Sequence, residues 1–427
     1  MARACILVLP IRVVAIGVAA IGLFASCDAR PRQPNVLLIL ADDLGWNDVG
    51  YHGSEIRTPH LDALATEGVR LESFYVQPYC SATRAALLTG RYPMRMGLQK
   101  GLIRPWEKDG LPLEERTLAE ALKGAGYATA VLGKWHLGAA REAYLPLWRG
   151  FDHHYGHYNG AIDYFTHELY GGLDWHRNGI AVDEEGYATD LLADEAVRWI
   201  RRVDPGRPFF LYLAFNAPHS PLQAPDVQRD RYPEIDDPRR RTYAAMVSAL
   251  DDGVGRIVAA LEEDGRLDDT IVVFASDNGG HPKAEGDNTP LRGQKGNAYE
   301  GGIRVPAFVS WRGRLPAGRV TNVPIHVVDL YPTLLRLAGV STEQTLPVDG
   351  RDMWPALAGP GDDPLDRSEL LLDISLGRGA IRDGEWKLLV LNRDTPSEVS
   401  ELYRLSNDPI ESRNLAGQRP DVVERLR

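Results

Sequence analysis

Asn35-Val36-Leu37-Leu38-Ile39-Leu40-Ala41-Asp42-Asp43-Leu44-Gly45 is the stretch of sequence from which the fold can be predicted. Residues 36–41 form a continuous apolar run, and this run ends abruptly in two carboxylates, Asp42 and Asp43. A run without polar alternation is typical of a strand that is buried on both faces, as in a parallel sheet. The sequence therefore predicts a buried strand whose carboxyl end carries two acidic side chains.

Three further apolar runs follow the same design. They are residues 128–132, followed by Gly133-Lys134-Trp135-His136; residues 209–215, followed by Asn216-Ala217-Pro218-His219; and residues 271–276, followed by Asp277-Asn278-Gly279-Gly280. Helical patterns separate the runs, at residues 58–68, 117–125, 187–201 and 243–264. Alternating strands and helices predict an α/β fold with a large, mostly parallel central sheet sandwiched by helices.

Ligands of such sheets lie beyond the carboxyl ends of the strands, so the polar tails of the four runs are expected to face one crevice. Its side chains would be those of Asp42, Asp43, Lys134, His136, His219, Asp277 and Asn278. Three carboxylates and one amide are hard oxygen donors, which suit calcium or magnesium better than zinc. Taken singly, each Asp could instead be a turn or N-cap residue, and residues 277–280 could be a hairpin turn.

A single cysteine opens another predicted helix, in the stretch Pro78-Tyr79-Cys80-Ser81-Ala82-Thr83-Arg84-Ala85-Ala86-Leu87-Leu88-Thr89-Gly90-Arg91. Gly90 is placed to end this helix, with Ser81 or a neighbour as its cap, and Arg84 lies one turn after Cys80. The helix N-terminus and Arg84 together favour an anion beside Cys80. Cys80 could also be a small buried core residue, but it is the only cysteine outside the leader described next.

The first 27 residues have the pattern of a signal peptide. Arg3 and Arg12 precede an apolar run at residues 13–24, which is too short to span a bilayer. Phe24-Ala25-Ser26-Cys27 resembles a bacterial lipoprotein cleavage box, which would leave a lipidated Cys27 as the N-terminus; ordinary signal-peptidase cleavage is the alternative. We therefore expect an exported protein, periplasmic or at the cell surface.

The chain of 427 residues has a net charge of -11, which argues against a nucleic-acid or acidic-membrane partner, since those require a broad basic face. Any positive field for an anionic substrate must then be local. Residues 290–296 add Arg292 and Lys295, for which a solvated loop is the alternative interpretation. A predicted strand at residues 305–311 follows this loop.

Two more segments have a distinct character. Residues 151–168 are rich in histidine and aromatic residues, and we expect a loop at the mouth of the crevice there, with a second metal site as the alternative. Short strands are predicted at residues 370–374, 380–382, 385–391 and 401–405, with a hairpin at Asp383-Gly384. They predict a small antiparallel sheet in a C-terminal subdomain, residues 346–427, after a catalytic domain at residues 34–345. The helix predicted at residues 420–427 ends without a cap, which is typical of a truncated chain.

These motifs resemble those of the formylglycine-dependent sulfatases of the alkaline phosphatase superfamily, over residues 35–415. The most specific are Asp42-Asp43, Cys80 to Arg91 with Leu88-Thr89-Gly90-Arg91, Gly133-Lys134-Trp135-His136-Leu137-Gly138, and Asp277-Asn278-Gly279. The local sequence motifs are most similar to those of the arylsulfatase B branch, for example Gly45-Trp46-Asn47-Asp48-Val49-Gly50 and Thr58-Pro59-His60-Leu61-Asp62. Animal members of that branch desulfate N-acetylgalactosamine 4-sulfate in glycosaminoglycans.

The resemblance implies an alkaline phosphatase-like fold and a role for each site residue. Cys80 would be converted to formylglycine by a separate maturation enzyme. One Ca²⁺ would be held by Asp42, Asp43, Asp277, Asn278 and the modified side chain of Cys80. The other implied roles are Arg84 and Lys134 clamping the hydrated aldehyde and the sulfate, His136 contacting the diol, and His219 and Lys295 lying on the leaving-group side.

The implied reaction begins with attack of one hydroxyl of the aldehyde hydrate on sulfur, and the substrate alcohol leaves with a proton from His219 or Lys295. His136 then helps to deprotonate the second hydroxyl, and sulfate is expelled. The substrate would be a sulfated carbohydrate or aryl sulfate. Ala82 stands where the usual Cys-x-Pro-x-Arg signature has proline, inside the segment that the maturation enzyme must read.

Two other functions fit the same residues. A phosphonate monoester hydrolase or phosphodiesterase would share the scaffold, because tetrahedral anions of sulfur and phosphorus look alike to a cation-lined pocket. A catalytically silent protein that binds sulfated glycans would belong to another class. It predicts the loss of one or more site residues, whereas all the candidate positions here carry suitable residue types.

Overall fold

The computed structural model describes Met1, residues 33–361, Leu365, Arg367 and residues 369–427. Residues 33–427 form one compact unit. Apart from Met1, the predicted leader with Cys27 lies outside the described residues.

A ten-stranded sheet forms the centre of this unit. Its strands, in spatial order, are β13 (Arg319–Thr321), β2 (Val69–Leu71), β12 (Ala307–Ser310), β11 (Thr270–Ser276), β1 (Asn35–Ala41), β10 (Phe209–Ala214), β4 (Ala128–Gly133), β5 (His153–Gly156), β8 (His176–Arg177) and β9 (Ile180–Ala181). The five strands from β11 to β5 are all parallel, with Leu38 opposite Tyr212 on one side and Val273 on the other. The predicted mostly parallel sheet is confirmed. Strand β12 runs antiparallel to β11, and residues 277–306 connect the two strands.

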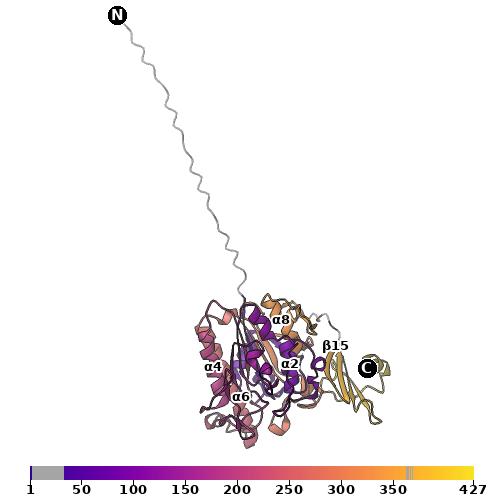
Figure 1. Ribbon diagram of the computed structural model, residues 1–427. Helices are drawn as coiled ribbons and strands as arrows, with labels where there is room; N and C mark the ends of the chain where they lie inside the picture. The colour runs from indigo at the N-terminus through magenta and orange to yellow at the C-terminus, as the bar shows by residue number, and fades with distance from the viewer. Residues whose placement is uncertain (2–32, 362–364, 366, 368) are drawn as a thin grey trace. The chain divides into compact units, whose positions relative to one another are not determined.

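Helices cover both faces of the sheet, as the apolar runs predicted. On β1, Val36, Leu38 and Leu40 face one core cluster, whereas Leu37 and Ile39 face the other. Helices α2 (Cys80–Thr89), α3 (Leu118–Gly124) and α8 (Leu330–Leu337) pack in the first cluster. Helices α1 (Pro59–Glu67), α4 (Ala188–Arg202) and α6 (Pro238–Glu263) pack in the second, and Figure 1 shows α4 and α6 on the opposite side of the sheet from α2 and α8.

Helix α6 begins five residues earlier than the predicted start at Tyr243. The carboxylate of Asp237 accepts hydrogen bonds from the backbone N–H groups of Arg239 and Arg240, and Pro238 occupies the first helical position. This is a strong N-terminal cap. The prediction missed it because the arginines of the first turn hide the apolar periodicity.

Four antiparallel strands form the predicted C-terminal sheet: β15 (Glu369–Ser375), β16 (Arg378–Asp383), β17 (Trp386–Leu391) and β18 (Val399–Arg404). Asp383 pairs with Trp386 across the predicted hairpin, and Gly384 has a φ of 57°, as a turn of this kind requires. Helix α10 (Pro420–Leu426) packs on this sheet through Val422. The boundary at residues 345/346 stays a prediction.

The remaining elements are short. They are β3 (Phe74–Tyr75), β6 (Glu168–Leu169), β7 (Gly172–Leu173), β14 (Ile325–His326), α5 (Asp226–Arg229), α7 (Glu300–Ile303) and α9 (Trp354–Ala358), with 3₁₀ turns at Gly50–His52, Pro93–Met96, Leu98–Lys100, Glu142–Tyr144, Pro146–Trp148, Leu267–Asp269, Pro282–Ala284 and Val327–Asp329.

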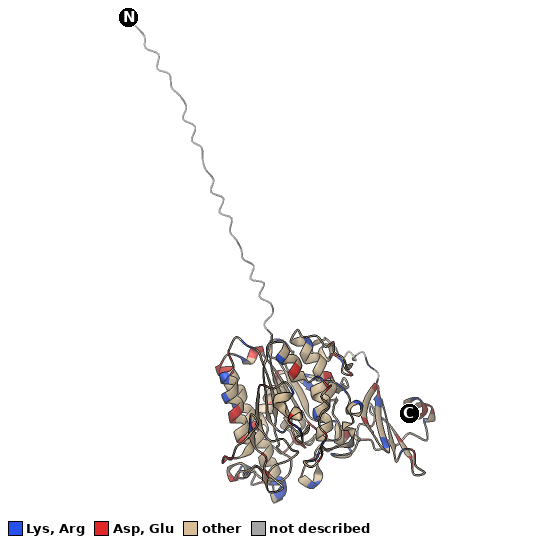
Figure 2. Cartoon of the chain, in the orientation of Figure 1, with Lys and Arg blue, Asp and Glu red and all other residues tan. Residues whose placement is uncertain are grey.

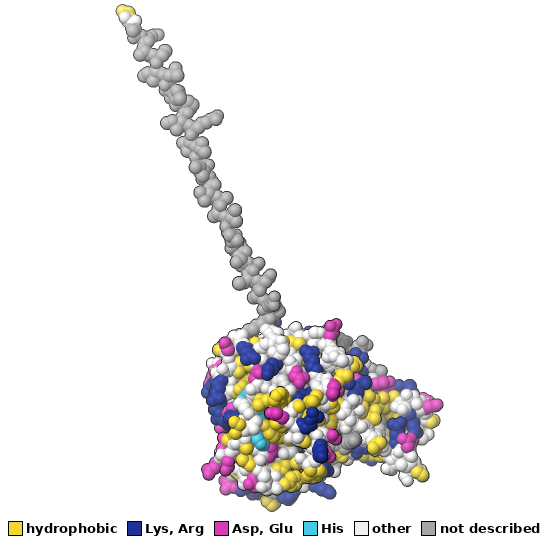
Figure 3. Space-filling model, in the orientation of Figure 1, with side chains coloured by type: hydrophobic (Ala, Val, Ile, Leu, Met, Phe, Trp, Pro, Cys, Tyr) yellow, Lys and Arg dark blue, Asp and Glu magenta, His cyan; other side chains and the backbone are white. Residues whose placement is uncertain are grey.

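Charges of both signs lie on the helices around the sheet (Figure 2), and on the face drawn in Figure 3 acidic and basic side chains alternate with hydrophobic ones. Within the described part of the chain, no helix is both long and apolar enough to cross a membrane.

Candidate active site

The predicted crevice lies where the parallel strands end. Asp42 and Asp43 follow β1, Lys134 follows β4, and Asp277 follows β11. Backbone hydrogen bonds fix these tails side by side: the N–H of Asp277 donates to the carbonyl of Ala41 at 3.0 Å, and the N–H of Lys134 donates to that of Ala214 at 2.8 Å. The strand register therefore determines which side chains meet.

Cys80 enters the crevice from the first residue of α2. Tyr79 has extended backbone angles and supplies no side-chain cap, and Gly90 ends the helix in the left-handed conformation, as expected. Ser81 is not the cap, because its hydroxyl accepts a hydrogen bond from the N–H of Ile103 at 3.1 Å. The N-terminus of α2 therefore stays open toward the crevice.

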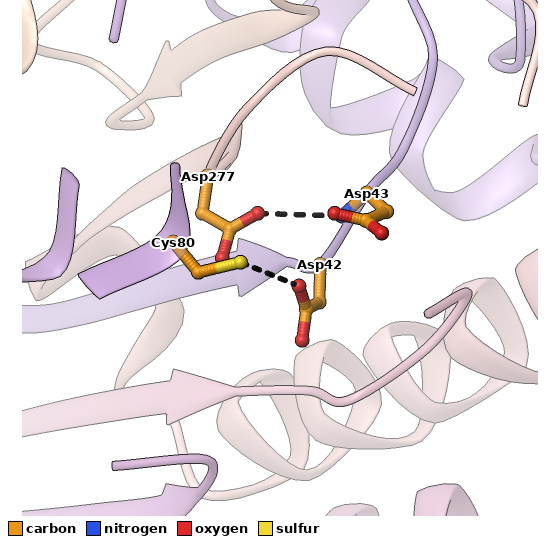
Figure 4. A group of neighbouring side chains, drawn as sticks. All are labelled: Asp42, Asp43, Cys80 and Asp277. Atoms are coloured by element: carbon orange, nitrogen blue, oxygen red, sulfur yellow. Dashed lines mark hydrogen bonds between the residues drawn. The ribbon is translucent and has the colours of Figure 1, made fainter. Parts of the chain in front are cut away.

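Oxygen donors converge on Cys80. The ligand atoms of Asp42, Asp43, Cys80 and Asp277 all lie within 4.8 Å of one another, and Figure 4 shows these side chains turned toward a common centre. The Sγ of Cys80 is 3.7 Å from Asp42 Oδ1 and 3.3 Å from Asn278 Oδ1. Because Asn278 Nδ2 donates to Asp43 Oδ1 at 2.7 Å, its amide oxygen is left to face the cysteine.

Each carboxylate of this cluster also meets at least one cation, and Asp42 meets two, Lys134 and Arg84. Lys134 Nζ donates a hydrogen bond to the carboxylate of Asp42. Lys295 Nζ lies 2.6 Å from Asp43 Oδ1, and Arg84 Nη2 lies 2.8 Å from Asp277 Oδ2. The side chains of Arg84 and Lys134 are fully buried, whereas that of Lys295 is 10% exposed. The positive charge is thus local to the crevice, within an acidic chain.

The donor set fits a divalent cation. Burial, followed by the neighbouring charge of Asp277, raises the pKa of Asp42 to about 7. For Asp43, burial alone would raise the pKa, but Lys295 and His219 reverse this and lower it. A divalent cation among these oxygens would relieve the repulsion between Asp42 and Asp277, and carboxylate and amide oxygens are the ligands that calcium prefers.

A small pocket opens above Cys80. It has a volume of about 150 Å³ and is lined in part by Cys80, His136 and His219. His219 Nε2 lies 3.7 Å from Asp43 Oδ2, and burial is the main reason why the pKa of His219 falls to about 3. His136 Nε2 lies 3.1 Å from the carbonyl oxygen of Ile103. Every residue proposed for the site therefore lies in one connected group.

Two neighbouring segments differ from expectation. Arg292 does not join the cluster; it donates a hydrogen bond to the hydroxyl of Tyr403 at 2.7 Å, which ties its loop to the C-terminal sheet. The histidine-rich segment contains β5, and only its later part lines the pocket, at Gly160 and Ala161. Among the described residues, none of its histidines belongs to a group that could hold a metal ion.

Sequence reasoning missed the rest of the pocket wall. Residues 102–105 and 169–170 form it, and neither segment carries a motif or an apolar period. Tyr212, whose hydroxyl lies 3.4 Å from Arg84 Nη1, was also missed, because on the sequence it is one residue of a buried strand.

Residues 34–340 match the family model described as Sulfatase. The chain belongs to the sulfatase family. The chain is 41% identical to arylsulfatase J of Mus musculus, in a match that covers 85% of this chain and 63% of that protein, so it spans less than two thirds of the length of this relative. Among solved structures it resembles Ps i-CgsB in complex with k-i-k-neocarrahexaose, with 38% identity, a TM-score of 0.83, and coverage of 91% of this chain and 90% of the other. It also resembles the PsFucS1 sulfatase from Pseudoalteromonas sp., with 32% identity, a TM-score of 0.76 and coverage of 90% and 86%. The predicted family and its alkaline phosphatase-like fold are confirmed.

Proposed function

We propose that this chain hydrolyses sulfate monoesters on sulfated sugars, of the N-acetylgalactosamine 4-sulfate type. The observation that carries the proposal is the convergence of three carboxylates, one amide and three cations on Cys80 at an open helix N-terminus. The relative solved with k-i-k-neocarrahexaose supports an oligosaccharide as substrate.

Two groups would complete the site. One Ca²⁺ held by Asp42, Asp43, Asp277, Asn278 and the modified Cys80 would neutralise charge on the sulfuryl oxygens. Conversion of Cys80 to formylglycine would supply an aldehyde hydrate as the nucleophile.

The protein's own side chains would orient the sulfate and move protons. Arg84 is fixed by Asp277 and by the carbonyl of Lys134, at 2.9 Å, so its guanidinium is preorganised beside Cys80. His136 lines the pocket with Cys80 and would take a proton from the second hydroxyl of the hydrate. His219 and Lys295 meet at Asp43 on the pocket side. A bound sulfate anion would favour the protonated form of His219, and either His219 or Lys295 would then give a proton to the departing alcohol.

The protein would be exported, to the periplasm or the cell surface, and would depend on a formylglycine-generating maturation enzyme. A lipid anchor at Cys27 would be its one link to the membrane.

Mass spectrometry of the peptide that contains Cys80, after co-expression with a maturation enzyme, tests the nucleophile. We expect a loss of mass that corresponds to conversion of the thiol to the aldehyde, in spite of Ala82. A peptide that carries only the unmodified thiol would contradict the mechanism.

Turnover of matched substrates tests the reaction. We expect 4-nitrophenyl sulfate to be hydrolysed faster than an aryl phosphodiester or an aryl phosphonate monoester, and sulfate to be released from N-acetylgalactosamine 4-sulfate. Preference for the phosphorus esters would favour the phosphohydrolase alternative. Binding of sulfated glycans without any release of sulfate would indicate a silent binding protein.

A further inference from the structure

Two large aromatic side chains stand exposed at the mouth of the pocket. Trp106 is 65% exposed and Tyr170 is 78% exposed, and their ring centroids are 6.0 Å apart. They belong to segments 64 positions apart in sequence, so the fold and not the local chain brings them together. Exposed aromatic residues in pairs are unusual on a soluble surface and often mark a binding site.

This aromatic pair is continuous with the catalytic pocket. Tyr170 lines the pocket together with Cys80, and Arg104 and Pro105, which immediately precede Trp106, line it as well. The pocket holds about 150 Å³, which is below the roughly 300 Å³ of the smallest ordinary ligand sites. The pocket therefore admits the sulfated end of a substrate, and the next part of that substrate must lie over the rim.

The backbone at Tyr170 gives an independent reason to expect a function. Strands β6 and β7 pair with Leu169 opposite Gly172, which leaves Tyr170 and Gly171 as a two-residue hairpin turn. Both have positive φ, 52° for Tyr170 and 80° for Gly171. Such turns favour asparagine, aspartate or glycine at the first position, and a bulky residue there is strained. Strained conformations of this kind cluster at functional sites.

Arg104 adds a cation to the same rim. It is exposed, its guanidinium carbon lies 5.7 Å from the ring centroid of Trp106, and it forms no ion pair with a carboxylate among the described residues. A guanidinium held over an aromatic ring is oriented but stays available to an anion. The rim thus offers an apolar face and a positive charge side by side.

We infer that Trp106, Tyr170 and Arg104 form a subsite for the sugar ring next to the sulfated one in an oligosaccharide. This inference rests on the proposed sulfatase activity. The axial C–H groups of a pyranose ring pack on the aromatic faces, and Arg104 binds an anionic group of that sugar, a carboxylate or a second sulfate ester. The preferred substrate is accordingly an anionic oligosaccharide and not a free monosaccharide.

Kinetics with two sugars of different length test the subsite. The probes are N-acetylgalactosamine 4-sulfate and a trisaccharide in which this sulfated sugar is the non-reducing end and glucuronate follows it, with 4-nitrophenyl sulfate measured in parallel. Each protein is matured in the same way, and conversion of Cys80 is checked by mass spectrometry. We expect the wild type to prefer the trisaccharide by about tenfold in kcat/KM, mainly through KM.

Two variants remove the aromatic faces. Tyr170→Asn places a favoured residue in the turn, so a loss of binding cannot be attributed to a broken hairpin, and Trp106→Ala removes the second ring. In each variant we expect the trisaccharide-to-monosaccharide ratio of kcat/KM to fall about three- to tenfold. The matched control is Trp148→Ala, since Trp148 is 62% exposed but does not line this pocket, and its ratio is expected to stay at the wild-type value.

Arg104→Gln tests the anionic group. With a trisaccharide whose glucuronate carboxyl has been reduced to an alcohol, the wild type should lose several-fold in kcat/KM, and the variant should no longer distinguish the two trisaccharides. If Arg104→Gln lowered kcat/KM by the same factor with both trisaccharides, the role of Arg104 in binding the carboxylate would be overturned.

The failures of the two proposals can be separated. The subsite is overturned, and the sulfatase activity stands, if 4-nitrophenyl sulfate is turned over but kcat/KM is equal for the monosaccharide and the trisaccharide. The same conclusion follows if the trisaccharide-to-monosaccharide ratio of kcat/KM is unchanged in both aromatic variants. Release of sulfate from the aryl ester but from neither sugar overturns the subsite for this class of glycan. The absence of any sulfate release from matured protein overturns the activity on which the subsite rests.

Discussion

Two clusters of buried charge lie at opposite ends of one short segment, and only one of them has the features of an active site. The site cluster joins Asp42, Asp43 and Asp277 to three cations around Cys80. The second, which we call the interface cluster, joins Lys387 of β17 to Glu300 of α7 and Glu411. The loop from Asp277 to Glu300 connects the two.

The interface cluster is closed. Lys387 Nζ lies 2.8 Å from each glutamate, Tyr75 donates its hydroxyl to Glu300 Oε2 at 2.8 Å, and the N–H of Glu300 donates to Glu411 Oε2 at 2.7 Å. Lys387 and Glu300 are fully buried. Its groups satisfy one another and fasten the C-terminal sheet to the body of the protein.

The site cluster, in contrast, faces a pocket, and its oxygens point at one another around a thiol. Burial and the charge of Asp277 raise the pKa of Asp42, but burial also raises the pKa of Glu411 in the interface cluster. Burial of charge alone therefore does not identify a functional site. Convergence of donors beside an accessible pocket does.

The largest expected effect is that of Cys80→Ala. It should lower sulfate release from 4-nitrophenyl sulfate by about a thousandfold or more, because the proposed nucleophile is made from the side chain of Cys80. The melting temperature should stay close to that of the wild type, since the thiol makes only weak hydrogen bonds at 3.3 and 3.7 Å. Activity retained by a folded Cys80→Ala protein would remove Cys80 from the mechanism.

Asp277→Asn should distinguish the site cluster from the interface cluster by its effect on calcium binding. The substitution keeps the size of the side chain and removes its charge, so we expect calcium content, measured by atomic emission after dialysis, to fall, and the rate to fall about a hundredfold or more. Calcium should raise the melting temperature of the wild type but not of this variant, because only the folded site binds the ion. A variant of the interface cluster, Lys387→Met, serves as the control and should keep the calcium-dependent shift. Equal calcium content in wild type and Asp277→Asn would place the ion elsewhere.

The sequence allowed most of the site to be predicted because its residues follow strands. The apolar run before Asp42 and the one before Asp277 both indicate buried parallel strands, and parallel strands end at the same edge. Lys134 and His219 could be placed for the same reason. The open N-terminus at Cys80 followed from the helix formers after it and from Gly90.

The parts that could not be predicted depend on long-range packing. Arg292 and Lys295 lie three positions apart on one loop, yet one pairs with Tyr403 and the other with Asp43. Nothing local to the loop distinguishes them. The pairing of Trp106 with Tyr170 and the contact of Lys387 with Glu300 likewise join segments that share no pattern.

Lys387→Met should have a large effect on stability and little on chemistry. Removal of one partner leaves Glu300 and Glu411 buried beside each other, which costs about 3–5 kcal/mol of unfolding free energy. Urea unfolding followed by circular dichroism measures this loss. The kcat for 4-nitrophenyl sulfate, taken at a temperature where the variant is folded, should stay within about twofold of the wild type. A loss of kcat without a loss of stability would mean that the interface cluster acts on the site.

The smallest effects come from a matched pair of tyrosines, one in each cluster. Tyr75 donates to Glu300 at 2.8 Å, whereas the hydroxyl of Tyr212 lies 3.4 Å from Arg84 Nη1, at the limit of a hydrogen bond. Tyr75→Phe should therefore lower the unfolding free energy by about 1.5–3 kcal/mol, because it strips a buried carboxylate of a donor. Tyr212→Phe should cost about 0.5 kcal/mol, since Arg84 keeps its bonds to Asp277 and to the carbonyl of Lys134. Both values come from the same urea titration. If Tyr212→Phe proved the costlier of the two, the site cluster would depend on internal hydrogen bonds as much as the interface cluster does, and the distinction between an open and a closed cluster would fail.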